Sequence, residues 1–225
     1  AALMMMAAMA MTSCASSKKI NGDSNASKDS EMGKNEEDLD NSYLVLSDAQ
    51  QDIVKKNNAF ALRLFNKVTD MESKVISPMS VSYLMGMLAN GADGITQQEI
   101  LKAIGCEGVS VNDLNELYKA MLLHANHQDK QTTVNIANYI AVNKNFKLNK
   151  DFSQQVSDGY QAGIESLDFT SSKSTDRING WCKEKTNGMI PRIIDQVSAD
   201  AVSYLMNAIY FKGTWQNKFN AKDTK

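Results

Sequence analysis

The residue types that most often carry chemistry are scarce in this chain of 225 residues. It contains three cysteines, Cys14, Cys106 and Cys182, and two histidines, His124 and His127. The cysteines are odd in number, widely spaced and form no C-x-x-C pair, which argues against a disulfide framework and a structural zinc site. The histidines share one face of a predicted helix, but nothing nearby completes a metal site. We therefore predict no metal and no cofactor, and we interpret the second and third cysteines as small buried apolar residues.

Catalytic motifs are absent from the sequence as well. It has no G-x-S-x-G, no H-E-x-x-H and no cysteine–histidine pair with a residue to orient it, so we predict that the protein is not an enzyme. The formal net charge is −2, with neither a basic excess to attract nucleic acid nor a long block of like charge. The hydrophobic fraction of 43% is enough for a sizeable core.

Cys14 stands apart from the other cysteines because it follows an apolar run. Residues 3–11 are apolar, and Thr12 and Ser13 lead directly into Cys14. The run suits the apolar region of a signal peptide and is too short to span a bilayer. Small residues that end in Cys resemble a bacterial lipobox, where the peptide is cut before a Cys that is then acylated. We expect residues 1–14 to be a signal peptide with Cys14 as the lipidation site.

The alternative is an ordinary secretory signal in which the Cys is incidental. Both interpretations predict an exported protein, either extracellular or located at the cell surface or in the periplasm. A lipid anchor would hold the protein at a membrane surface without spanning the bilayer, and it would be the only contact with the membrane.

Residues 15–46 form the next segment, which is rich in Ser, Asn, Lys, Asp and Glu and poor in apolar residues. Such a segment buries too little surface to offset the entropy lost on ordering, so we predict a disordered polar tether. The folded domain is expected to comprise residues 47–225, where hydrophobic periodicity begins.

Periodicity in this region predicts a mixture of helices and strands. Apolar residues at helical spacing predict helices over 47–70, 77–90, 96–104, 113–127 and 150–160, and a sixth that begins at Ser174 or Thr175 and ends at Asn187-Gly188. A capping box beginning at Thr96 is expected to open the third helix. Alternating or continuous apolar residues predict strands over 134–142, 164–169 and 202–211, and Val75-Ile76 reads as a short strand-like pair. Helices between strands would cover a sheet, so the expected fold class is α+β.

Two polar features stand out within these elements. Ser77 is a good N-cap, and Pro78 fits the first helical position because its missing N–H would have been unpaired there. Asn207 lies in the middle of an apolar strand, where Asn is depleted. A buried amide needs hydrogen-bond partners, so we predict that Asn207 belongs to a polar network.

Five segments, in this order, resemble the serpins. SPMSVS (77–82) with ANGADGIT (89–96) resembles helix B and the turn after it, and NIANYIAV (135–142) resembles the second strand of sheet A. Residues 160–169 resemble the stretch from helix E to the first strand, and INGW (178–181) with TNGMI (186–190) resembles helix F and its exit. NAIYFKGTW (207–215) resembles the third strand and its end. The resemblance runs from about Asn57 to Thr224.

The resemblance implies the N-terminal part of a serpin fold, with helices and three strands of sheet A. Serpins are suicide inhibitors whose exposed reactive loop is cut by a protease and then inserted into sheet A. In the family, two helix-B serines and the third-strand Asn form a "shutter" below the gap that opens, here Ser77, Ser80 and Asn207. Trp215 matches the "breach" Trp at the top of the sheet. The reactive centre and the His that partners the shutter Asn would lie beyond Lys225.

Three functions remain open on these grounds. The first is inhibition of serine or cysteine endopeptidases by a monomeric full-length protein, with the target protease as partner. The second is a non-inhibitory serpin that acts as a surface binding or chaperone-like protein. The third is an unrelated surface lipoprotein that shares only the pattern. The residues of the hinge before the reactive loop would distinguish the inhibitory from the non-inhibitory function, because small residues there permit loop insertion.

Overall fold

The computed structural model describes residues 44–69, 73–125, 132–215, 217 and 222. The predicted signal peptide with Cys14, nearly all of the predicted tether, and His127 lie outside this part. No helix in the described part of the chain is long and apolar enough to cross a membrane.

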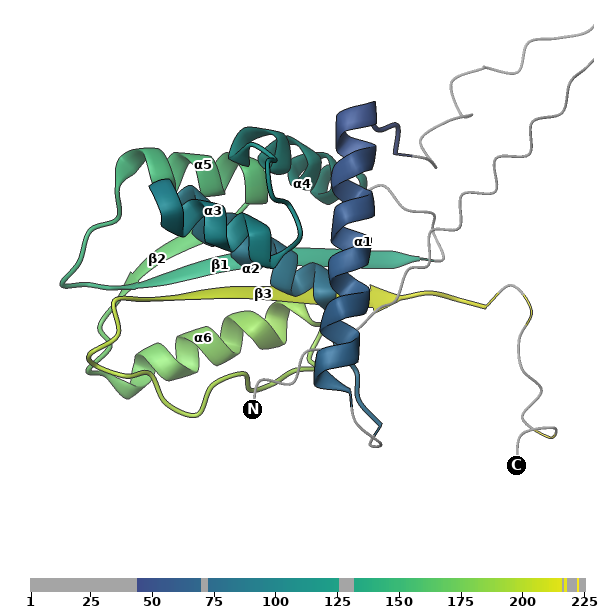
Figure 1. Cartoon of the computed structure of the whole chain (residues 1–225). Helices are drawn as coiled ribbons and strands as arrows, with labels where there is room; N and C mark the ends of the chain where they lie inside the picture. Colours follow the sequence, from purple (N-terminus) through teal and green to yellow (C-terminus); the bar gives the residue numbers. More distant parts are fainter. Residues whose placement is uncertain (1–43, 70–72, 126–131, 216, 218–221, 223–225) are drawn as a thin grey trace, which may run out of the picture.

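The described residues form a three-stranded sheet between two helical layers (Figure 1). Five helices cover one face and a single helix covers the other. The elements in chain order are α1 (Asp48–Val68), α2 (Pro78–Asn90), α3 (Gly94–Ala103), α4 (Val111–Ala125), β1 (Thr133–Asn143), α5 (Lys150–Tyr160), β2 (Gly163–Leu167), α6 (Ser172–Lys185) and β3 (Ser203–Lys212).

The sheet has the strand order β2-β1-β3. β1 runs parallel to β2, with Tyr139 opposite Gly163, and antiparallel to β3, with Asn138 opposite Asn207. β1 is therefore the central strand, and β3 is an edge strand within the described residues. α6 and the segment after it connect β2 to β3 across one face of the sheet (Figure 1).

Side chains of β1 alternate between two hydrophobic cores, as successive residues of a strand must. Ile136, Ile140 and Val142 pack with the layer of α1–α5, whereas Tyr139 and Ala141 pack with α6. The expectation that helices cover the sheet is confirmed, and both faces of β1 are covered. The larger core lies between the sheet and the five helices, and the smaller core lies under α6.

Helix starts follow local capping, and two of them differ from the prediction. α2 begins at Pro78 with Ser77 as its N-cap, as predicted. α3 begins at Gly94 rather than near Thr96, because the side chain of Asp93 caps it by accepting the Gly94 N–H. Thr96 is therefore inside the helix.

α6 begins at Ser172 with Ser171 as its N-cap, not Ser174 or Thr175 as predicted. The hydroxyls of the two predicted caps bond elsewhere. Ser174 Oγ donates to the carbonyl of Asp168 at 2.6 Å, and Thr175 Oγ1 accepts the N–H of Val197 at 3.1 Å.

Two strand predictions also need correction. Val75 and Ile76 join no strand ladder within the described residues, because the sheet here contains only β1, β2 and β3. β2 ends at Leu167 instead of Phe169, since Asp168 starts a turn in which its carboxylate accepts hydrogen bonds from Thr170. The remaining element boundaries agree with the prediction within about two residues, as far as the described residues extend, which is the usual uncertainty of element ends.

Candidate functional site

Asn207 lies in the middle of β3, on the face that packs against α1–α5. Its Nδ2 donates to Asn138 Oδ1 at 2.8 Å and, more weakly, to the carbonyl of Ala137 at 3.4 Å. Its Oδ1 is buried and accepts no hydrogen bond from any described residue. A buried amide oxygen without a donor is destabilising, so this atom needs a further partner.

Asn138 extends the network from the sheet to the helical layer, and sequence reasoning did not single it out as a site residue. It is only 3% exposed, and its Nδ2 donates to the carbonyl of Tyr160 at 2.7 Å. Tyr160 is the last residue of α5, where helix carbonyls have no partner within the helix. A second Asn directly opposite Asn207 in the antiparallel register is the signal that could have revealed it.

Ser77 and Ser80 form a separate pair at the start of α2. Both are buried, their Oγ atoms lie 2.9 Å apart, and Ser77 Oγ accepts the N–H of Ser80 at 3.3 Å. α2 packs against β3, so the serines and Asn207 belong to neighbouring elements. Within the described residues no hydrogen bond joins the serine pair to Asn207.

A tyrosine cluster continues the hydrogen-bonded network behind Asn138. The rings of Tyr83, Tyr118 and Tyr160 lie with their centroids 4.7–6.2 Å apart. The Tyr160 hydroxyl donates to Asn115 Oδ1 at 2.8 Å, and Asn115 exchanges two amide hydrogen bonds with Asn90. The network therefore runs from β3 through β1 and α5 to α4 and α2.

Burial dominates the electrostatics of this cluster. It raises the pKa of the Tyr83, Tyr118 and Tyr160 hydroxyls, because a phenolate would be poorly solvated there. The Tyr83 hydroxyl is buried and has no hydrogen-bond partner among the described residues. The Tyr118 and Tyr160 hydroxyls serve as neutral hydrogen-bonding groups, and the Tyr83 ring serves in packing.

Trp215 lies three residues beyond the end of β3 and is 70% exposed. The C-terminal half of β3 separates it from Asn207, so the structure does not bring the predicted breach residue together with the predicted shutter residues.

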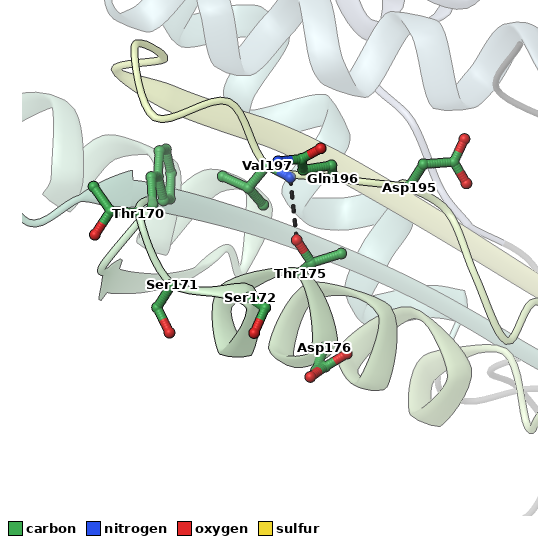
Figure 2. A pocket seen from close by; sticks show the side chains of 9 residues that line it. Thr170, Ser171, Ser172, Thr175, Asp176, Asp195, Gln196 and Val197 are labelled. Carbon is green, nitrogen blue, oxygen red and sulfur yellow. Dashed lines mark hydrogen bonds between the residues drawn. The ribbon is translucent and has the colours of Figure 1, made fainter.

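A shallow pocket of about 420 Å³ lies at the start of α6 (Figure 2). Hydroxyls, an amide and two carboxylates line it, and Thr175 bonds the backbone of Val197 at its edge. None of the lining groups is a buried polar atom without a partner, so the pocket offers no built site for a ligand.

In the described part of the chain, no group of three His, Cys, Asp or Glu residues is placed to hold a metal ion. Cys106 and Cys182 are buried thiols, which confirms their interpretation as buried residues. Desolvation is the largest cause of the raised pKa of each, which disfavours the reactive thiolate.

Comparison with known proteins gives the family. Residues 55–225 match the family model described as Serpin (serine protease inhibitor). The chain belongs to the serpin family. Iripin-1 of Ixodes ricinus is 33% identical over 176 residues, which cover 75% of this chain and 45% of that serpin. The chain spans about half the length of the curated relatives it matches.

Solved structures, a serpin among them, share the fold. The thermophilic serpin tengpin in its latent state gives a TM-score of 0.72 at 31% identity, covering 79% of this chain and 48% of tengpin. Thyroxine-binding globulin in complex with thyroxine gives a TM-score of 0.66 at 26% identity, covering 76% of this chain and 48% of that protein. In serpin terms β2, β1 and β3 are the first, second and third strands of sheet A, in the order that the motifs predicted.

Proposed function

We propose that the full-length protein inhibits serine or cysteine endopeptidases by cleavage of a reactive loop and its insertion into sheet A. The observation that carries this proposal is the family match over residues 55–225, together with strands in the order β2-β1-β3. Both faces of β3 are covered, because Leu205 packs on the larger core and Met206 and Ala208 pack on the smaller one. Addition of an extended segment to a sheet is a known mode of peptide binding, and it requires such a sheet as its template.

The proposed reaction starts as ordinary proteolysis and stops halfway. The protease's serine or cysteine attacks the scissile carbonyl of the reactive loop, an acyl-enzyme forms, and the amine of the C-terminal fragment leaves. The cut loop then inserts beside β3 and carries the acylated protease with it. Distortion of the protease active site prevents hydrolysis of the ester or thioester. On this proposal the protein acts as an inhibitor rather than as an enzyme.

Ser77, Ser80 and Asn207 are the proposed shutter residues, and Trp215 is the proposed breach residue. The unpaired Oδ1 of Asn207 supports this assignment, because a donor from the rest of the domain, such as the shutter His, would complete it. We add Asn138 to the proposed shutter, since it holds the Asn207 amide and the end of α5 at the same time.

The test is covalent trapping. The full-length protein is incubated with trypsin-, chymotrypsin- and elastase-like serine proteases and a papain-like cysteine protease, and the products are separated by SDS electrophoresis. An SDS-stable complex with at least one active protease is expected. The same protease with its nucleophile replaced by alanine should give none.

A non-inhibitory serpin is the second candidate. It is supported by the likeness to thyroxine-binding globulin, which was solved with thyroxine bound and so uses this fold for ligand binding. Cleaved protein without any stable complex, for every protease of the panel, would reject inhibition and favour this candidate.

We also propose that the protein is an exported bacterial lipoprotein acylated at Cys14, and a monomer in solution once released. The support is the apolar run 3–11 followed directly by Thr12, Ser13 and Cys14. Cys14→Ala should move the protein from the membrane to the soluble fraction and abolish incorporation of labelled fatty acid, whereas Ser16→Ala should change neither. Membrane association that survives Cys14→Ala would contradict the anchor.

A further inference from the structure

Asn-Gly dipeptides occur at three places in the described part of the chain: Asn90-Gly91, Asn179-Gly180 and Asn187-Gly188. A fourth, Asn21-Gly22, lies outside the described residues. Asn followed by Gly is prone to lose its side-chain amide, because the backbone nitrogen of the small Gly can reach the Asn side chain. The reaction needs an amide that is free to turn and a Gly nitrogen that is free to attack. Hydrogen bonds therefore decide which of these pairs reacts.

Hydrogen bonds hold the side chains of two of the three asparagines. Asn90 Nδ2 donates to a carbonyl of its own helix at 2.8 Å, and the Asn90 amide exchanges two bonds with the amide of Asn115. Asn179 Nδ2 donates to the carbonyl of Ile194 at 2.9 Å, and Asn179 Oδ1 accepts two backbone N–H groups. Gly180 lies inside α6, where its N–H is bonded within the helix. Neither amide can turn toward the following nitrogen without losing these bonds.

Asn187 differs from both of these asparagines. Its side chain is exposed and makes no hydrogen bond to any described residue. It directly follows Thr186, the C-cap residue of α6, and its backbone is left-handed with a φ of 49°. Asn adopts this conformation more readily than most residues do. Among the described Asn-Gly pairs, Asn187-Gly188 is thus the one whose amide is free to turn.

The backbone at Asn187 forms a Schellman cap on α6. The Gly188 N–H donates to the Lys183 carbonyl at 2.7 Å, and the Asn187 N–H donates to the Glu184 carbonyl at 3.2 Å. An N–H group must give up its proton before its nitrogen can attack a carbonyl carbon. The short bond to Lys183 therefore keeps the Gly188 nitrogen unreactive until the cap opens, and helix ends are among the segments that open most readily.

Thr186 fastens this cap to the rest of the chain. Its Oγ1 donates to the Cys182 carbonyl at 2.7 Å and accepts the Ile190 N–H at 3.0 Å. The Thr186 carbonyl also accepts the Met189 N–H at 3.0 Å. Thr186 is buried, so water does not readily replace these partners. Its hydroxyl therefore opposes opening of the cap.

We infer that Asn187 is a site of spontaneous deamidation, and that the Schellman cap of α6 sets the rate. When the cap opens, the backbone nitrogen of Gly188 loses its proton and attacks Asn187 Cγ. The bond between Cγ and the side-chain nitrogen breaks, ammonia leaves, and a cyclic succinimide forms. Water then opens the ring at either carbonyl, which gives aspartate or isoaspartate. The reaction consumes only water and needs no oxidant.

Both products weaken the end of α6. Each places a carboxylate just past the helix C-terminus, where the helix dipole is already partly negative. Isoaspartate also adds a methylene to the main chain, which moves the Gly188 N–H out of register with the Lys183 carbonyl. Asn187→Asp reproduces the new charge, and it is expected to speed hydrogen exchange of the Gly188 amide about two- to fivefold.

The experiment follows the full-length protein in neutral to mildly alkaline buffer and maps its peptides by mass spectrometry over time. Isoaspartate is measured separately by labelling with an isoaspartyl O-methyltransferase and radioactive S-adenosylmethionine. A synthetic peptide of residues 183–190 gives the rate without the folded cap. Asn187→Gly removes the site and keeps the cap, because Gly adopts the left-handed conformation freely. Thr186→Val removes the hydroxyl and keeps the side-chain shape, whereas Thr186→Ser keeps the hydroxyl.

In the wild type, Asn187 is expected to react faster than Asn90 and Asn179, and about two- to tenfold more slowly than the peptide, the effect of one net hydrogen bond. Thr186→Val should raise the Asn187 rate about fivefold through the lost hydroxyl bonds, and Thr186→Ser should stay near the wild type. Asn187→Gly should give no modified or labelled peptide from this segment.

Faster reaction at Asn90 or Asn179 overturns the assignment of the site, and so does an Asn187 that stays intact while the peptide reacts. An Asn187 rate equal to that of the peptide overturns the role of the cap, as does a rate that Thr186→Val leaves unchanged. Loss of the fold in Thr186→Val would speed all three pairs together. The comparison of the wild type with the peptide then decides the role of the cap.

Discussion

Replacing Asn138 of β1 with alanine is expected to destabilise the protein, because it removes two short buried hydrogen bonds. Asn138 Nδ2 is the donor to the Tyr160 carbonyl, and Asn138 Oδ1 accepts the shorter bond from Asn207. The exchange leaves that carbonyl without its donor and leaves the Asn207 amide with only the 3.4 Å contact to Ala137. Each buried polar group left unpaired costs about 1–3 kcal/mol, so we expect a loss of about 2–4 kcal/mol in the free energy of unfolding.

The assay is urea unfolding of freshly purified full-length protein, followed by far-UV circular dichroism. Asn145→Ala is the control, since Asn145 is exposed in the turn after β1 and should change the free energy by less than about 0.5 kcal/mol. The double variant Asn138→Ala with Asn207→Ala should lose less than the sum of the single variants, because they share one hydrogen bond. A loss in Asn138→Ala no larger than that of the control would refute the reasoning.

Three further predictions concern packing, capping and acid stability. A Cβ on Gly86 would overlap the Tyr160 hydroxyl, so Gly86→Ala should lose about 1–3 kcal/mol, whereas Gly180→Ala, with nothing within 4 Å of its Cβ, should gain up to about 1 kcal/mol, both by urea unfolding. Ser77→Ala should lower stability by about 1–2 kcal/mol through the lost N-cap, and Ser77→Thr should retain most of it in the same assay; equal losses would argue against capping. Hydrogen bonds from Lys144 and Thr170 lower the pKa of Asp168 from 3.8 to about 2, so the stability contributed by the ionised carboxylate is present above pH 3.8 and is lost as pH falls toward 2. Between pH 5 and pH 2 the thermal midpoint of Lys144→Gln should therefore fall less than that of the wild type. The same fall in both proteins would contradict this prediction.

Most of the fold could be predicted from sequence because its elements differ clearly in period. The switch from helical spacing to alternation at Val134 located β1, and the isolated amphipathic run 150–160 located α5 with the bounds that the structure has. Helix starts were less predictable where hydroxyl residues cluster. Before α6 several Ser and Thr compete as caps, and only the tertiary partners of Ser174 and Thr175 show that neither serves as one.

The candidate site was only partly predictable, because its contacts join residues far apart in the chain. Asn207 stood out as a polar residue in an apolar strand, but its partner Asn138 depends on the antiparallel register of β1 and β3. The space that Gly86 leaves for the Tyr160 hydroxyl depends on the packing of α2 against α5, to which no local pattern points. The role proposed for Trp215 came from the family resemblance alone.

Asn138 and Tyr139 are neighbours in β1 and serve opposite faces of the sheet. Asn138 joins β3 to α5 on one face, and Tyr139 joins β2 to α6 on the other. If the backbone of β1 is rigid, the two networks act independently although only one peptide bond separates them. Asn138→Ala and Tyr139→Phe, which keeps the stacked ring and removes only the hydroxyl, should then have effects on unfolding that add within about 0.5 kcal/mol. A larger coupling energy would show that β1 transmits strain between the shutter and α6, and that the networks on the two faces are energetically coupled.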